Sequence, residues 1–342
     1  MRGRLSAVQA AWVVAGLAAL LLPVFVSTPY DLGVAQQALI FVVLVQGFNF
    51  TVGITRRISL GHIGFWAIGA YTTALLTTKA GLPGLVAMAV GVVLSGLIAV
   101  VLAALTNRLQ AHYLSLATLG FGSIVQIVAT NWHGLTGGAD GVTGIPPLFG
   151  LGITGPAQIY YTLLAVVALG AWFTHFYLSS KAGRDASAMR QSEIAAESLG
   201  IRTSRVKTQT LVISAVFGSV AGALYAHTYG YVSPDAFTFA AMLLVLAMLV
   251  VGGPGSVAGP IVGALLLTYL PEWMRISEQY WQILYGVMLF AIVLWAPKGV
   301  PWLLGSGLRA IMRRGRADRT PPPAGPAGES SSATAQQTGA TR

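Results

Sequence analysis

Long apolar runs without charge constrain this chain more than any other feature of its sequence. VLSGLIAVVLAAL (93–105) and LLVLAMLVVGG (243–253) are continuous, with no alternation of apolar and polar residues. Only 9% of the 342 residues are charged, whereas soluble domains carry about a quarter. Lipid cannot satisfy backbone polar groups, so the spans must be helices or a closed barrel, and barrel strands alternate. The runs therefore predict an all-α polytopic membrane protein.

Ten apolar segments are candidate membrane spans, for which a helix needs about 20 residues, and the ninth of them is short. The first follows Arg2 and Arg4 like a signal peptide, but no small-x-small cleavage site comes after it, which favours a retained helix. After the last segment the chain is rich in Pro, Gly, Ser and Ala and cannot offset the entropy of ordering. We predict a transmembrane domain over 1–300 and a cytoplasmic, largely disordered tail over 301–342. The predicted spans cover 10–28, 32–53, 59–78, 83–106, 113–131, 158–178, 208–230, 236–252, 256–270 and 281–297.

The distribution of lysine and arginine indicates the orientation. The 132–157 loop contains neither residue, whereas the 179–207 segment contains six of them. Cytoplasmic loops carry the excess of basic residues, because each one near the end of a span resists translocation. With ten spans, this pattern places both termini and the 179–207 segment in the cytoplasm.

Several function classes are disfavoured by what the sequence lacks. The formal net charge is +10, but basic residues gather at the ends of apolar runs rather than on one face, which argues against nucleic-acid binding. The chain has no cysteine, no G-x-x-x-x-G-K-[ST], no H-E-x-x-H and no G-x-S-x-G. We therefore expect a non-catalytic protein without cofactor-binding or metal-binding residues. A secondary transporter stays an alternative, although such carriers place ionisable groups at the bilayer midplane, and here Asp and Glu fall in loops, tail or span edges.

A polar segment between two apolar runs, SEIAAESLGIRTSR (192–205), stands out. We predict a short helix from about Ser187 to Gly200, with a serine at its start and a left-handed glycine at its end. Glu193, Ala196 and Gly200 then fall on one face, with Glu197 beside it. Such a helix would either dock into a groove of a soluble partner or lie on the bilayer surface.

Neutral polar residues inside the spans are candidates for a solute pathway. Neutral polar side chains in membranes also hydrogen-bond between helices routinely, so both interpretations stay open. Gln36 and Gln37 lie in the second span as well, and we interpret His62 as a structural residue between helices. The candidate pathway residues are Gln46, Asn49, Thr118, Ser123 and Gln126.

Glycines recur at intervals of four in two places. Small residues at this spacing let helix backbones approach closely, so we predict helix packing, with a gate hinge as the alternative. Pro254 and Pro260 predict a tight or broken turn between the eighth and ninth spans. The glycines are Gly218, Gly222, Gly255, Gly259 and Gly263.

The polar segment and the run after it, AMRQSEIAAESLGIRTSRVKTQTLVISAVFGSVAGALYAH, resemble the glutamate–alanine–alanine loop of ABC import permeases. The version here resembles the branched-chain amino acid permease family of the LivM type. Three further blocks are similar to that family in the same order: RRISLGHIGFWAIGAYTTALL (56–76), YLSLATLGFGSIVQIVATNWHGLTGGADGVTGIP (113–146) and VLAMLVVGGPGSVAGPIVGALLLTYLPEW (245–273).

The resemblance implies a permease subunit of an ATP-binding cassette importer, with about ten helices and a type II-like core, in a bacterial inner membrane. It implies as partners a sister permease subunit, two cytoplasmic ATPases that hydrolyse the ATP, and an extracytoplasmic binding protein that delivers the amino acid. Glu193, Ala196, Glu197 and Gly200 would belong to the helix that couples to an ATPase. A urea or amide permease of the same superfamily is the alternative substrate class. Relatives typically carry an acidic and a basic residue where this chain has neutral Ser123 and Gln126, which leaves the substrate open.

Overall fold

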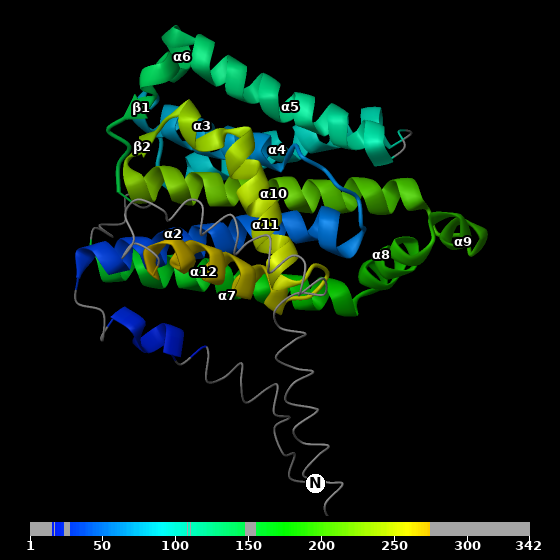
Figure 1. Cartoon of the computed structure of the whole chain (residues 1–342). Coiled ribbons are helices and arrows are strands. Elements are labelled where there is room, and N and C mark those ends of the chain that lie inside the picture. Colours follow the sequence, from blue (N-terminus) through cyan, green and yellow to red (C-terminus); the bar gives the residue numbers. More distant parts are fainter. Residues whose placement is uncertain are drawn as a thin grey trace, which may run out of the picture. The chain divides into compact units, whose positions relative to one another are not determined.

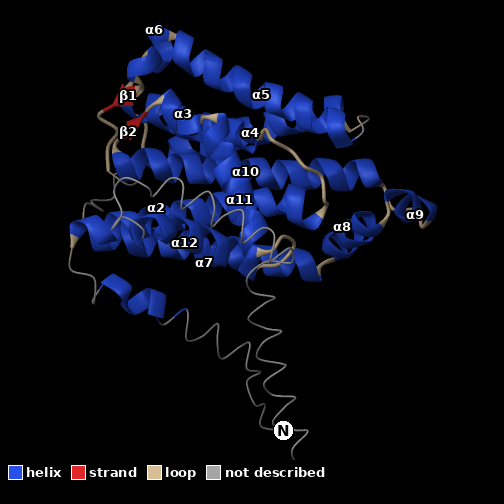
Figure 2. Ribbon diagram, in the orientation of Figure 1, coloured by secondary structure: helices blue, strands red, loops and turns tan. Residues whose placement is uncertain are grey.

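The structure is a computed structural model that describes residues 28–107, 109, 111–147 and 155–273, with residue 16 and residues 18–23. Helices make up most of this part of the chain, which also contains two short strands and the loops between the elements (Figure 2). The tenth predicted span (281–297), most of the first (10–28) and the tail (301–342) lie outside the described residues.

The element order follows the predicted apolar runs closely. In chain order the elements are α2 (Pro29–Phe48), the π-helix η1 (Asn49–Ile54), α3 (His62–Thr78), α4 (Gly84–Thr106), α5 (Ala111–Asn131), α6 (His133–Thr136), the 3-10 helix η2 (Gly138–Asp140), β1 (Val142–Thr143), α7 (Pro156–Ser179), α8 (Lys181–Gln191), α9 (Glu193–Ser198), α10 (Thr203–Tyr229), β2 (Tyr231–Val232), the 3-10 helix η4 (Pro234–Phe237), α11 (Phe239–Gly252) and α12 (Ala258–Trp273).

Among the described residues, five helices are long and apolar enough to cross a membrane. Each coincides with one of the predicted spans. The predicted spans 59–78, 236–252 and 256–270 are helices of 17, 14 and 16 residues, shorter than the usual span of about 20 residues. The five long helices are Pro29–Ile54, Gly84–Thr106, Tyr113–Asn131, Pro156–Ser179 and Thr203–Tyr229.

Helix α10 packs against α2, α3 and α4 (Figure 1). Its contact with α3 is close because small residues face each other there. A Cβ added to Gly222 would lie 2.2 Å from the carbonyl oxygen of Trp66, and one added to Gly69 would lie 2.2 Å from that of Ser219. Gly218 is less tight, since its Cβ would meet the Phe65 Cβ at 3.2 Å. The two backbones therefore touch at this crossing.

In helix α4 the small residues are buried and the large apolar residues are exposed, the reverse of a helix in a soluble protein. Its buried positions are all small, and its exposed positions include Leu85, Val93, Leu97, Val101 and Leu105. Large apolar side chains on the outside are stable only against lipid or another apolar surface, and small ones inside let neighbouring helices approach. The buried residues of α4 are Gly84, Ala87, Gly91, Ser95, Ala99, Ala103 and Thr106.

The two ends of α10 carry different structures (Figure 1). At 27 residues α10 is about 40 Å long. Its C-terminus leads into β2, which pairs antiparallel with β1 in the register Val142↔Val232, and α3 contacts both strands. Its N-terminus follows α8 and α9. The 132–147 loop and the 180–202 segment thus lie at opposite ends of the long helices.

A tight turn joins α11 to α12, as Pro254 and Pro260 suggested. Gly253 and Gly255 adopt φ values of 95° and 87°, which residues with a side chain rarely adopt. The two helices contact each other directly, because a Cβ on Gly263 would lie 1.8 Å from the Met248 carbonyl oxygen and one on Gly259 would lie 2.0 Å from that of Gly253.

Candidate functional site

The polar segment forms two helices instead of the single helix predicted from Ser187 to Gly200. Ser192 is extended, with φ −158° and ψ 120°, so it breaks the helix. Its hydroxyl then accepts a hydrogen bond from the Ala195 amide at 3.2 Å and caps α9. The prediction of the start was wrong because Ser187 instead donates to the Gly183 carbonyl inside α8. Gly200 has φ 79° and ends the element in the left-handed conformation, as predicted.

The faces of α9 are also arranged differently from the prediction. Ala196 is 1% exposed and packs inward against a cluster that includes Phe50 and Met189. Ile194 and Leu199, in contrast, are 79% and 78% exposed. Of the predicted face, Ala196 therefore packs against the chain itself, and the outward surface of the segment carries two large apolar side chains beside polar ones.

Charged and polar contacts join α9 to the start of α10. Glu193 forms an ion pair with Lys207, whose side chain is 9% exposed. The Thr203 hydroxyl donates to the Glu197 carboxylate at 2.6 Å. Burial lowers the pKa of the nearby Arg57 guanidinium, and the Glu193 carboxylate opposes this shift. A displacement of α9 would therefore pull directly on α10.

Asn49 and Gln46 both bond to their own chain. The Asn49 side chain donates to the Ser256 carbonyl at 2.9 Å and accepts from the Gly255 amide at 2.8 Å, so it holds the α11–α12 turn. Gln46 donates to the Val167 carbonyl of α7 at 3.3 Å. Both contacts fit the interpretation of interhelical hydrogen bonding.

The remaining predicted polar residues occupy a different region. The Thr118 hydroxyl accepts from the Leu60 amide at 3.0 Å and donates to the Leu114 carbonyl at 2.8 Å. Ser123 and Gln126 line a narrow cavity against η4 and α11. Thr118, Ser123 and Gln126 are thus grouped on α5, away from Gln46 and Asn49 on α2 and η1.

His62 is a structural residue between helices, as interpreted from the sequence. It is buried, and its two ring nitrogens lie 2.8 Å from the Leu44 carbonyl oxygen and 2.9 Å from the Ser214 hydroxyl. It therefore links α3 to α2 and α10.

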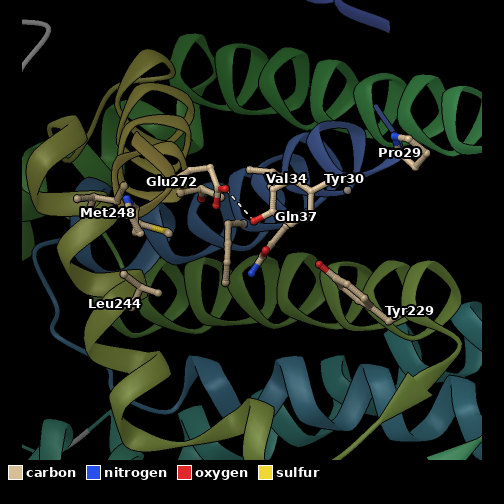
Figure 3. A pocket seen from close by; sticks show the side chains of 13 residues that line it. Pro29, Tyr30, Val34, Gln37, Tyr229, Leu244, Met248 and Glu272 are labelled. Atoms are coloured by element: carbon tan, nitrogen blue, oxygen red, sulfur yellow. Dashed lines mark hydrogen bonds between the residues drawn. The ribbon is translucent and has the colours of Figure 1, made fainter. Parts of the chain in front are cut away.

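A cavity of about 620 Å³ lies among α2, the end of α10, α11 and α12 (Figure 3). Gln37 and Tyr30 line it from α2, Tyr229 from α10, and Glu272 and Thr268 from α12. Gln37 was among the neutral polar residues of the second span considered from the sequence, whereas Tyr30, Tyr229, Thr268 and Glu272 were not selected. Which side of α2 stays open depends on where α11 and α12 pack.

The sequence matches a family model described as branched-chain amino acid transport system / permease component over residues 30–293. It is 34% identical over 292 residues to the high-affinity branched-chain amino acid transport system permease protein LivM of Escherichia coli (strain K12), covering 78% of this chain and 69% of that protein. It is 25% identical over 280 residues to the permease protein LivH of Salmonella typhimurium (76% and 90%).

A more distant relative is the ribose import permease protein RbsC of Escherichia coli (strain K12), at 24% identity over 263 residues (74% of this chain and 78% of that protein). The family model covers well over half of the chain, and the similarity to LivM extends over most of both proteins. The chain belongs to the family of permease components of branched-chain amino acid transport systems.

Proposed function

We propose that this chain is one of two membrane-spanning subunits of an ATP-driven importer of branched-chain amino acids in a bacterial inner membrane. Its identity to LivM is 34%, compared with 24% to a ribose permease, which favours an amino acid as the substrate. The chain itself is not catalytic: two cytoplasmic ATPase subunits hydrolyse the ATP, and an extracytoplasmic binding protein delivers the solute. A sister permease subunit of different sequence completes the pathway.

The proposed topology has ten transmembrane helices in a type II-like core, with both termini cytoplasmic. The opposite placement of the 132–147 loop and the 180–202 segment along α10 supports it (Figure 1), together with the excess of basic residues in the second segment. Residues 1–300 form the transmembrane domain and residues 301–342 a cytoplasmic tail. The end with β1 and β2 then faces the binding protein.

The observation that carries this proposal is the exposed apolar pair on α9. Ile194 in α9 and Leu199 directly after it are 79% and 78% exposed, and large apolar side chains grouped on the surface of a polar segment are typical of an interaction site. The contacts of Glu193, Glu197 and Ala196 fix the helix to the protein, and Gly200 ends it. We assign α9 as the coupling helix, with Ile194 and Leu199 inserted into a cleft of an ATPase.

Cross-linking tests this assignment in a chain that contains no native cysteine. Leu199→Cys should form a disulfide with cysteines placed on the membrane-facing surface of the ATPase, in the assembled transporter. Ala196→Cys is the matched control, because its side chain is buried and should not cross-link. Failure of Leu199→Cys at every ATPase position would favour a helix that lies on the bilayer.

The energy source is tested separately with the complete transporter in vesicles. Uptake should require ATP on the side of the ATPases. Uptake that continues without ATP and is abolished by a protonophore would contradict the importer and favour a secondary transporter.

A further inference from the structure

A helix too short to cross the membrane brings the α11–α12 turn against η1. Helix α11 has 14 residues, so at 1.5 Å per residue it is about 21 Å long, less than the hydrocarbon core of about 30 Å. In the turn that follows it, Gly255 and Ser256 both bond to the Asn49 side chain of η1. A Cβ added to Gly53 of η1 would lie 2.5 Å from the Gly255 amide nitrogen. The turn and η1 therefore meet backbone to backbone.

Arg190 contacts the same turn from α8. It lies in the last turn of α8, and a Cβ added to Gly255 would lie 2.2 Å from its Nη1 atom and 3.1 Å from its Cζ atom. The same added atom would lie 3.0 Å from the Gly53 carbonyl oxygen. The guanidinium group thus lies directly on the backbone of the turn, close to the point where the turn meets η1.

The position of this guanidinium has an electrostatic reason. Helix α11 ends at Gly252 and η1 ends at Ile54, and the C-terminal end of a helix carries partial negative charge that attracts a cation. Burial lowers the pKa of the Arg190 guanidinium, and the positive charge of Arg56 lowers it further. The guanidinium therefore lies at the turn against two unfavourable effects, which the two helix ends offset.

Helix α8 is tied more firmly to α9 than to the buried core. One residue separates the two helices in the chain, and Met189 of α8 and Ala196 of α9 lie in one buried cluster. Phe50 and Ile54 of η1 reach this cluster through apolar contacts, which have no preferred direction. The α2–η1 span is mostly buried, whereas most residues of α9 are exposed. A force on α9 would therefore displace α8 against η1.

We propose that Arg190 transmits the movement of α8 and α9 to the α11–α12 turn. Asn49 holds the turn to the buried α2–η1 span, and Arg190 holds it to the unit that contacts the ATPase. A displacement of α8 then changes the conformation of the turn, where Gly253 and Gly255 give the backbone freedom to change. Arg190 is thus a positioning residue. This inference rests on the proposed function, and it adds a second connection from the coupling helix into the membrane domain, besides the contacts of α9 with α10.

Thiol labelling of the turn in the assembled transporter tests this inference. Ser256 is exposed in the turn and the chain has no native cysteine, so labelling of this subunit in Ser256→Cys reports on the turn alone. Binding of a non-hydrolysable ATP analogue to the ATPases should change the labelling rate about 5-fold or more, as expected for coupling between two sites. A labelling rate that is the same with and without the analogue would contradict the inference.

Substitution of Arg190 tests its own part in this response. In Arg190→Met, which keeps the length of the side chain without the charge, the analogue should no longer change the labelling of Ser256→Cys, and leucine uptake should be lost. ATP hydrolysis should continue, which shows that the transporter is assembled. Arg190→Lys, which keeps both length and charge, should respond to the analogue more strongly than Arg190→Met.

Arg184→Met is the matched control on the same helix. Arg184 is exposed and donates to the Ser179 carbonyl at 3.0 Å, so its loss should leave the response of Ser256→Cys and the uptake of leucine unchanged. Equal losses in Arg184→Met and Arg190→Met would contradict a specific role of Arg190.

The failure of this inference is distinguishable from that of the proposed function. A wild-type transporter that takes up leucine without ATP contradicts the proposed function. A wild-type transporter that requires ATP, while its turn responds to the analogue equally with Arg190 and in Arg190→Met, contradicts only the role of Arg190.

Discussion

Replacing Gly222 by alanine should separate α10 from α3 and destabilise the protein. The added Cβ would lie 2.2 Å from the Trp66 carbonyl oxygen and 2.6 Å from the Ala70 amide nitrogen, both about 1 Å inside the usual contact distance of about 3.5 Å. Both obstacles are backbone atoms, which cannot rotate away as a side chain can. The cost should therefore lie in the upper part of the range for overpacking, about 2–3 kcal/mol.

The same substitution elsewhere provides the control. Gly96 lies inside α4 and has no atom within 4 Å of the position of an added Cβ. Gly96→Ala should gain about 0.5–1 kcal/mol from the lower conformational entropy of alanine in the unfolded chain. Gly222→Ala gains the same amount but pays the steric cost, so the difference between the two variants isolates the clash at about 2–3 kcal/mol.

Thermal unfolding of the purified protein in detergent measures this difference. A change of 2–3 kcal/mol corresponds to a Tm that is lower by about 5 °C or more for Gly222→Ala than for Gly96→Ala. Equal Tm values for the two variants would refute the close contact between α10 and α3. If Gly96→Ala lowered the Tm more than Gly222→Ala does, the conclusion that the space around Gly96 is open would be wrong.

Two further predictions concern the turn between α11 and α12 and the topology. Asn49→Leu removes both hydrogen bonds that hold Gly255 and Ser256, so it should destabilise the protein by about 2–4 kcal/mol. An unchanged Tm in detergent would show that these two hydrogen bonds do not stabilise the turn. Ala139→Cys should react with an impermeant thiol reagent on intact cells, whereas Ser198→Cys should react only after the membrane is opened; both side chains are exposed, so the reverse result would invert the proposed topology.

The sequence predicted the helices well because continuous apolar runs allow little else in a membrane. It also predicted that Gly200 is left-handed and that the α11–α12 turn is tight. These features depend on local chemistry, namely the freedom of glycine and the restriction of proline. Local chemistry is what a single sequence displays most directly.

The arrangement of the site was harder to predict, for a physical reason. The single-helix prediction failed because several serines could cap a helix, and only the folded chain shows that Ser192 does. Ala196 was assigned to the docking face from helical spacing, but spacing does not tell which face packs inward. Gln37 was not selected over Gln46 because their different surroundings arise from α7, α11 and α12, which are distant in sequence.

The packing of α4 determines which changes this chain can accumulate over evolutionary time. Outward positions such as Leu97 and Val101 can exchange among large apolar residues without touching another helix. Inward positions such as Gly91 and Ala99 have room for only the smallest side chains, because a larger one would push α4 away from its neighbours. Accepted substitutions should therefore keep side chains small on the inward face of α4 and keep them apolar on the outward face. A set of tolerated substitutions would then identify the buried face of this helix without a structure.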